Sequence, residues 1–265
     1  MKIVTDASEL VQGCAFVPTM GALHSGHQSL FTIAASRSEQ VLASIFVNPL
    51  QFESAEDLEK YPRTPEKDIE IAEAAGVTHL WLPHYEELYP EGFEKVLAGP
   101  LGNIYEGASR PGHFDGVVTV VSRLFELAQP KSAIFGEKDF QQLALIKKMK
   151  SGVDIIAAPT IRESDGLALS SRNVRLDPAA RKAATVISRA LFAASNEQNL
   201  ESAQSVMLHV LSEETTFSCD YAEIIDEDDF TQATDSTLHA RAIIAGWING
   251  IRLIDNISMN QGVRS

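Results

Sequence analysis

The sequence predicts an α/β protein with a Rossmann-like, doubly wound parallel sheet and a smaller C-terminal α+β domain. Through the first 160 residues, short apolar runs alternate with segments of helical periodicity, which is typical of a parallel sheet covered by helices on both faces. After residue 160, two helical segments are followed by strand-like segments, the order expected of an α+β unit. We therefore expect domains at residues 1–160 and 161–265, with the second acting as a lid.

The elements follow from apolar periodicity and from turn residues. In the first domain we expect strands at residues 14–19, 41–47, 79–82, 133–135 and 154–157, and helices at 25–38, 65–75, 115–127 and 138–150. In the second domain we expect helices at 178–194 and 200–214 and strands at 220–225, 240–248 and 251–257. Pro178 suits a first helical turn, and Asn249-Gly250 is a strong hairpin signal.

Composition limits the partners that the chain can have. The 265 residues are 45% hydrophobic and 22% charged, as in ordinary globular proteins, and the formal charge of −14 disfavours general nucleic-acid binding. The chain contains no run of about 20 apolar residues and its N-terminus does not resemble a signal peptide. Two cysteines far apart in the sequence are typical of reduced thiols. We expect a cytoplasmic protein with no nucleic-acid or membrane partner.

Two histidines follow the first predicted strand, in the segment VPTMGALHSGH (residues 17–27). His24 and His27 can bind a metal, bind an anion or cap a helix. Zinc is disfavoured because a stable site needs three or four ligands and the cysteines show no ligand spacing, so we expect no metal held by the protein. An anion site is favoured, because N–H groups at a helix start bind phosphate and glycines allow close approach. Capping without further function stays the alternative.

The phosphate motifs most often used by nucleotide-binding proteins do not occur. The chain contains no GxGxxG and no GxxxxGK[ST], so the usual dinucleotide fingerprint and P-loop transfer are both disfavoured. An H-x-G-H segment on a doubly wound sheet instead resembles the nucleotidyltransferase superfamily, in which the two histidines hold a triphosphate.

Further polar segments follow predicted strands or the domain junction. Leu169-Ser170-Ser171-Arg172-Asn173 offers hydroxyl and guanidinium donors to phosphate oxygens. In FGEKDFQQ (135–142), the glycine allows close approach and Lys138 can neutralise phosphate. FVNPLQF (46–52) brings two amides and little charge, which suits a neutral hydroxyl or carboxylate substrate. RPGHF (110–114) is either a substrate-side loop or a structural turn.

Taken together, these motifs resemble the pantothenate synthetase (pantoate–β-alanine ligase) family. The matching stretches are FVPTMGALHSGH, SIFVNPLQF, YPRT, RPGHFDGV, FGEKDFQQL and ESDGLALSSRN, in family order between residues 16 and 173. The resemblance implies ATP-dependent condensation of pantoate with β-alanine through a pantoyl adenylate, giving pantothenate, AMP and pyrophosphate. It also implies Mg²⁺ and a homodimer.

The resemblance carries roles onto individual positions. His24, His27 and Lys138 would be catalytic, with His27 as the proton donor. Gln51 and Gln142 would hold pantoate, with Asn48 beside them. The residues that would contact ATP are Met20, Gly21, Ala22, Leu23, His24, Ser25, Gly26, His27, Gly136, Glu137, Lys138, Asp139, Ile161, Leu169, Ser170, Ser171 and Arg172. Mg²⁺ would be held largely by ATP, and the sequence does not choose between Asp68 and Asp139 as an additional ligand.

The sequence departs from the family at its periphery. FVPTM begins after only 15 residues, and the link between Met149 and Asp154 is short. Two other functions stay open. A nucleotidyltransferase with another acceptor predicts cations around the second substrate, whereas Asn48, Gln51 and Gln142 are neutral. A non-catalytic nucleotide-binding protein predicts ATP binding without pyrophosphate release.

Overall fold

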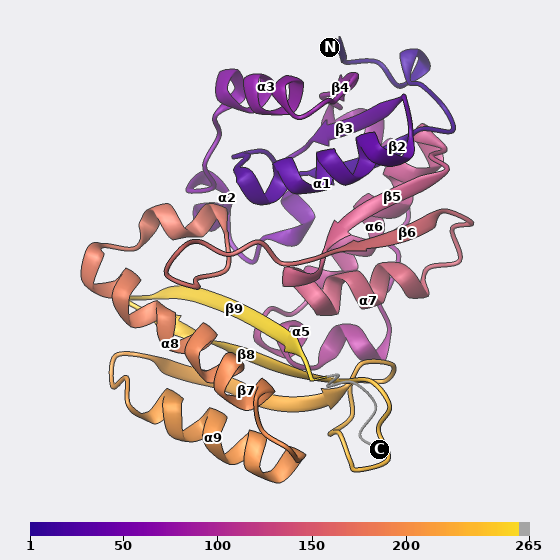
Figure 1. Ribbon diagram of the computed structural model, residues 1–265. Coiled ribbons are helices and arrows are strands. Elements are labelled where there is room, and N and C mark those ends of the chain that lie inside the picture. The colour runs from indigo at the N-terminus through magenta and orange to yellow at the C-terminus, as the bar shows by residue number, and fades with distance from the viewer. Residues whose placement is uncertain (260–265) are drawn as a thin grey trace. The chain divides into compact units, whose positions relative to one another are not determined.

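The computed structural model describes residues 1–259, which divide into two compact units (Figure 1). Unit 1 comprises Met1–Glu137 and Gln141–Thr160. Unit 2 comprises the chain from Ile161 onward together with Lys138–Phe140, a three-residue segment that interrupts unit 1. The lid role expected of residues 161–265 stays a prediction.

Unit 1 is built on a parallel sheet. Within residues 1–259 this sheet has six strands in the order β1-β4-β3-β2-β5-β6. They are β1 (Lys2–Val4), β2 (Ala15–Thr19), β3 (Val41–Ile45), β4 (His79–Trp81), β5 (Ser132–Gly136) and β6 (Asp154–Ala158). The chain builds the sheet first to one side of β2 and then to the other, so a topological switch point lies at the carboxyl ends of β2 and β5, where such sheets bind ligands.

Helices cover both faces of this sheet. Successive strand residues point to opposite sides, so apolar side chains on each side need a helix to bury them. Val17 packs in one cluster with Phe31, whereas its neighbour Phe16 meets Phe125 on the other face, with ring centroids 6.4 Å apart. Phe31 belongs to α1 and Phe125 to α6. The helical segments are η1 (Ala7–Glu9), α1 (Ser25–Arg37), η2 (Pro49–Gln51), α2 (Ala55–Glu59), α3 (Pro65–Ala74), α4 (Tyr85–Leu88), η3 (Pro100–Asn103), α5 (Glu106–Ser109), α6 (His113–Ala128), η4 (Glu137–Asp139) and α7 (Phe140–Lys148).

Unit 2 packs two helices against an antiparallel sheet. The strands are β7 (Ser218–Asp226), β8 (Ala240–Ile248) and β9 (Ile251–Ser258), in that order, and the helical segments are η5 (Ser171–Arg175), α8 (Pro178–Ser195) and α9 (Leu200–Ser212). Leu191 of α8, Met207 of α9 and Ile244 of β8 share one buried apolar cluster. Asn249 and Gly250 join β8 to β9 with φ of 49° and 72°, the left-handed backbone of a two-residue hairpin turn.

The predicted fold class is confirmed by this topology. Several details differ from the sequence prediction, among them the short helices α2, α4 and α5, which were not predicted. The helix predicted at 138–150 begins at Phe140, because Glu137–Asp139 form a separate 3₁₀ turn. Strand β1, of three residues, was not predicted. Among the described residues, no helix has the length and apolar character that crossing a membrane requires.

Candidate functional site

His24 and His27 stand where β2 has ended and α1 begins. His24 is the N-cap of α1, and its Nδ1 accepts a hydrogen bond from the Gly26 N–H at 3.1 Å. The Nδ1 of His27 accepts one from the His24 N–H at 3.3 Å, which completes a capping box made of two imidazoles. The ring centroids lie 4.1 Å apart. The structure thus shows that both histidines cap the helix, while the expected anion role stays a prediction.

The capping bonds decide which edge of each ring is a donor. A backbone N–H only donates, so an Nδ1 that accepts one carries no proton, and a neutral ring then holds its proton on Nε2. Both imidazoles thus present Nε2–H. The helix amides contribute less than the sequence suggested, because Gly26 N–H bonds to His24 Nδ1 and His27 N–H bonds to the His24 carbonyl at 2.8 Å. These two amide N–H groups are therefore already hydrogen-bonded within the protein.

A buried carboxylate holds the segment that leads into these histidines. Asp68 of α3 is 2% exposed and accepts from the N–H of Ala22 at 2.9 Å and of Leu23 at 2.7 Å. Thr64 donates its hydroxyl to the same carboxylate at 2.9 Å. Gly21 has φ of 80°, and a Cβ there would lie 2.9 Å from Asp68 Oδ2, so the glycine is required. Asp68 therefore acts here as an acceptor for backbone amides.

Asn48 and Gln51 lie after β3, in and beside the turn η2. The Asn48 amide donates to Gln51 Oε1 at 2.9 Å and to the Gly116 carbonyl at 3.1 Å, while its oxygen accepts from Tyr89 Oη at 2.8 Å and Leu50 N–H at 3.2 Å. Asn48 is fully buried. All of its hydrogen-bonding capacity is thus used within the protein, which fits an orienting role better than the direct substrate contact that the sequence suggested. Because Gln51 Oε1 faces Asn48, Gln51 presents its NH₂ end away from it.

The RPGHF loop, whose role the sequence left open, contacts the turn η2 through the Gln51 carbonyl. Arg110 Nη2 donates to the Gln51 carbonyl at 3.2 Å, and His113 Nδ1 lies 2.9 Å from that oxygen. Arg110 Nη1 also lies 3.1 Å from His113 Nε2. At Gly116, an added Cβ would lie 2.2 Å from the Leu50 carbonyl oxygen, so α6 touches η2 directly. The loop therefore positions the backbone that carries Gln51.

The FGEKDFQQ segment is divided between the units. Gly136 ends β5 and Glu137 begins η4, both in unit 1, whereas Lys138 and Asp139 belong to unit 2, with Lys138 Nζ 3.6 Å from Asp139 Oδ1. Gln142 is partly buried on α7.

The two glutamines of this segment differ in their surroundings. Gln141 is 7% exposed, donates to the carbonyls of Leu101 and Ile104 at 2.8 Å each, and accepts from Glu106 N–H at 3.1 Å. Gln141 is therefore structural, which leaves Gln142 as the candidate that faces substrate.

The remaining predicted phosphate ligands lie on a loop of unit 2. Leu169 N–H bonds to the Ile161 carbonyl at 2.9 Å, which closes the loop between them. Ser170 caps the turn η5, its hydroxyl oxygen accepting from Arg172 N–H at 3.3 Å. The structure thus groups His24, His27, Gln51 and Gly136 in unit 1, and Lys138 with Ser170, Ser171 and Arg172 in unit 2.

Comparison with known proteins decides the family. The family model described as pantoate-beta-alanine ligase matches residues 2–258, nearly the whole chain. The chain belongs to the pantoate-beta-alanine ligase family. The resemblance inferred from the motifs is confirmed, and with it the predicted ATP-dependent ligase activity.

Relatives cover the whole length of this pantoate-beta-alanine ligase family member. A pantothenate synthetase of Acidothermus cellulolyticus is 46% identical over 93% of this chain and 86% of its own, and one of Thermus thermophilus is 44% identical over 98% and 99%. The crystal structure of a Thermus thermophilus pantothenate synthetase matches with a TM-score of 0.93 at 43% identity, covering 98% of this chain and 100% of that one. The pantoate-beta-alanine ligase of Francisella tularensis, complexed with beta-gamma ATP and beta-alanine, matches with a TM-score of 0.78 at 34% identity over 99% of each chain.

Sequence reasoning missed the residues that support the site of this ligase. Asp68 was considered only as a metal ligand, and its contacts to residues 22 and 23 span 46 and 45 positions in the chain. Tyr89, which bonds to Asn48, carries no motif at all. Arg110 and His113 did stand in a recognised motif, but their partner was not predictable from local spacing.

Proposed function

We propose that the chain makes pantothenate in two steps at the carboxyl end of its parallel sheet. The pantoate carboxylate attacks the α-phosphorus of ATP, forming pantoyl adenylate and releasing pyrophosphate. The amine of β-alanine then attacks the acyl carbon, and AMP leaves. No protein nucleophile takes part, so catalysis rests on positioning and on stabilisation of developing charge.

The two capping histidines would meet the triphosphate of ATP. This role is supported by their Nδ1 bonds, which place an N–H donor on Nε2 of each ring, and by their place beside the switch point of the sheet. Donors fixed before the reaction stabilise negative charge without reorganising. His27 would act as the proton donor toward the phosphate oxygens, through its Nε2–H, as pyrophosphate leaves. The capping box is the single observation that carries this proposal.

The cationic and hydroxyl side chains of unit 2 would bind the same phosphates. Lys138, Ser170, Ser171 and Arg172 would contact the phosphate oxygens, whereas the backbones around Gly136 and Ile161 would border the nucleotide. Lysine neutralises phosphate as a point charge, and arginine adds paired donors. We propose that unit 2 closes over ATP as a lid, since its candidates complement those of unit 1.

Neutral amides would hold pantoate. Gln51 would donate through its NH₂ end, because Asn48 holds the opposite end of that amide. Gln142 would contact pantoate from another side. Asn48 would contribute indirectly, by fixing Gln51. Amides suit hydroxyl and carboxylate groups, whereas an acceptor carrying its own phosphate would call for additional cations.

Mg²⁺ would bind together with ATP and be held largely by its phosphates. Among residues 1–259, no group of three or more histidine, cysteine, aspartate or glutamate side chains has an arrangement that holds a metal ion. Both Asp68 oxygens already accept hydrogen bonds. These residues do not fit a protein-built magnesium cage, and we derive no step from one. A homodimer stays a proposal that rests on the family resemblance, and a cytoplasmic location stays one that rests on the composition of the sequence.

Pyrophosphate release tests the proposed route. We would incubate the protein with ATP, Mg²⁺ and pantoate, with and without β-alanine. We expect about one pyrophosphate per active site without β-alanine and steady turnover with it. No release from a folded protein that binds ATP would overturn the proposal.

A histidine variant tests the assignment of the site. We expect His27→Ala to lower turnover by roughly 10²–10³-fold. The matched control is His209→Ala, since His209 is an exposed side chain on α9 and should leave turnover unchanged. Near-normal adenylate formation by folded His27→Ala would remove His27 from the mechanism.

A further inference from the structure

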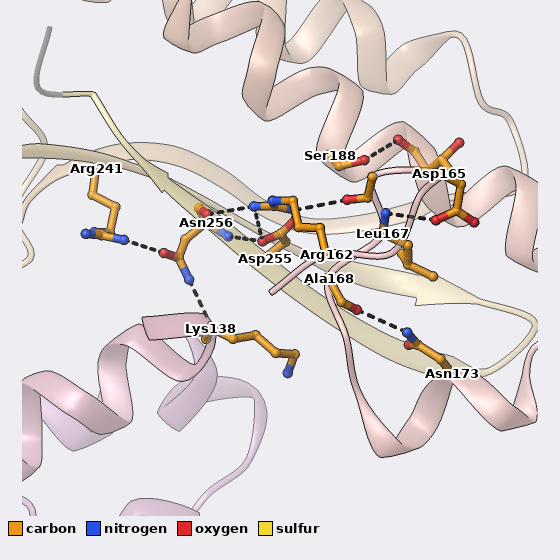
Figure 2. Close-up of polar contacts among 12 residues, drawn as sticks. Lys138, Arg162, Asp165, Leu167, Ala168, Asn173, Ser188, Arg241, Asp255 and Asn256 are labelled. Carbon is orange, nitrogen blue, oxygen red and sulfur yellow. Dashed lines mark hydrogen bonds and ion pairs between the residues drawn. The ribbon is translucent and has the colours of Figure 1, made fainter. Parts of the chain in front are cut away.

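The turn that carries Lys138 is held by the C-terminal hairpin, 118 positions away in the sequence. Asn256 of β9 donates its amide N–H to the Lys138 carbonyl at 2.9 Å (Figure 2). The Asn256 oxygen accepts from Arg241 Nη1 of β8 at 2.6 Å. Asn256 and Arg241 are each 5% exposed; the bond between them is buried, and the bond from Asn256 to the Lys138 carbonyl is partly buried.

The orientation of the Asn256 amide follows from its partners. Arg241 has only donors and the Lys138 carbonyl has only acceptor sites, so the Asn256 oxygen must face Arg241 and its NH₂ must face Lys138. Arg241 itself is held by Glu227 at 2.8 Å and lies over the Phe140 ring, 4.0 Å from its centroid. The turn is therefore fixed on both sides of Asp139, at Lys138 and at Phe140.

Neighbouring contacts hold the turn that precedes the second predicted phosphate segment of unit 2. Asp255, the neighbour of Asn256, pairs with Arg162 through both carboxylate oxygens, one of them at 3.0 Å. Arg162 also donates to the Gly166 carbonyl at 3.2 Å. In the same loop, Asn173 donates to the Ala168 carbonyl at 3.0 Å. Figure 2 shows polar contacts that run from Lys138 through Asn256 and Asp255 to Arg162, which also bonds to the Gly166 carbonyl. The separate bond between Asn173 and Ala168 closes the loop that contains Ser170–Arg172.

We infer that Asn256 is a positioning residue that aims the Lys138 ammonium at the phosphates of ATP. It acts by fixing the peptide carbonyl of Lys138, while the Asp255–Arg162 pair beside it holds the turn at Gly166 that precedes the loop of Arg172. The two cationic segments are then presented from one framework, the β8–β9 hairpin. This inference rests on the proposed phosphate role of Lys138.

A double-mutant cycle tests the inference. We would measure kcat and KM for ATP in the full-length chain for Asn256→Ala, Lys138→Met and the combination. Loss of one buried hydrogen bond predicts about a tenfold lower kcat/KM for ATP in Asn256→Ala. If Asn256 acts through Lys138, its substitution costs less than about twofold once the ammonium is gone, because contacting groups are not additive.

The matched control is Asn196→Ala. Asn196 also donates its amide to a carbonyl of unit 2, that of Phe192 at 2.8 Å, but has no link to the Lys138 turn. We expect its kcat/KM to equal that of the parent. Should Asn256→Ala fail to fold, Asn256→Asp keeps the size and the bond to Arg241, turns an oxygen toward the Lys138 carbonyl, and should lower kcat/KM at least as far.

The outcomes separate this inference from the proposed function. An Asn256 variant with parental kcat/KM, or one whose loss is as large in the Lys138→Met background, overturns the inference alone. Lys138→Met with parental kcat/KM overturns the phosphate role of Lys138 and the inference with it. A parent chain that releases no pyrophosphate overturns the proposed function.

Discussion

Replacing Asp68 with asparagine should disorganise the segment that we propose to bind ATP, without removing any group expected to touch ATP. The best fit of the asparagine leaves its oxygen toward Leu23 N–H and the Thr64 hydroxyl, and puts its NH₂ 2.9 Å from Ala22 N–H, where Oδ2 stood. One charge-assisted bond is lost and two donors then face each other. Bonds to charged groups contribute about 1.5–3 kcal/mol, so we expect the free energy of unfolding to fall by about 2–4 kcal/mol.

The same substitution should lower the kcat/KM for ATP. Ala22 has φ of 51°, a conformation that costs energy and that the Asp68 bonds stabilise. We expect kcat/KM for ATP to fall about tenfold or more, because about 1.4 kcal/mol corresponds to a factor of ten. Denaturant unfolding and steady-state kinetics measure the two effects. Thr64→Val is the control, since it removes one bond to Asp68 and keeps both amide bonds. A folded Asp68→Asn within twofold of the parent in kcat/KM would refute this reasoning.

Further predictions concern glycine and cysteine. Gly116→Ala should destabilise the protein by about 1–3 kcal/mol, because its methyl would meet the Leu50 carbonyl, and thermal unfolding checks this. Gly136→Ala has no described atom within 4 Å of the added methyl, so its stability should be unchanged while its KM for ATP rises, as kinetics would show. Burial raises the pKa of Cys14 from 9.0 to about 11. Its thiol therefore stabilises the fold fully below pH 9, and about 3 kcal/mol is lost as the pH rises toward 11. The unfolding free energy of Cys14→Ala should fall less steeply over this range, and in the folded parent a thiol reagent should modify the exposed Cys219 first.

Local sequence signals predicted the elements that are long and periodic. The predicted strand at 240–248 coincides with β8, and the Asn-Gly turn has the left-handed backbone expected of it. Strand β1 was not predicted because three residues are too few to show alternation. The helices α2, α4 and α5 were not predicted because they span too few turns to show helical periodicity. Length therefore limited what could be predicted of the fold.

The candidate site was predictable where its residues form a motif and not where they support one. His24 and His27 were recognised from spacing, yet their capping bonds required the helix to be seen. No local pattern predicts the supporting residues Asp68, Tyr89 and Asn256, because they contact the motifs from 41 to 118 positions away in the sequence. Buried polar side chains on strands are also concealed by apolar neighbours, as on β9.

The short passage of Lys138–Phe140 through unit 2 affects how the protein can be divided. A fragment that starts at Ile161 lacks the Phe140 ring over which the Arg241 guanidinium lies, and a fragment that ends at Thr160 removes the Lys138 carbonyl from Asn256. Cutting the chain at the obvious boundary thus damages both products. A peptide bond cleaved after residue 160 should leave the two pieces associated, and separately expressed halves should recover activity only when they are produced together.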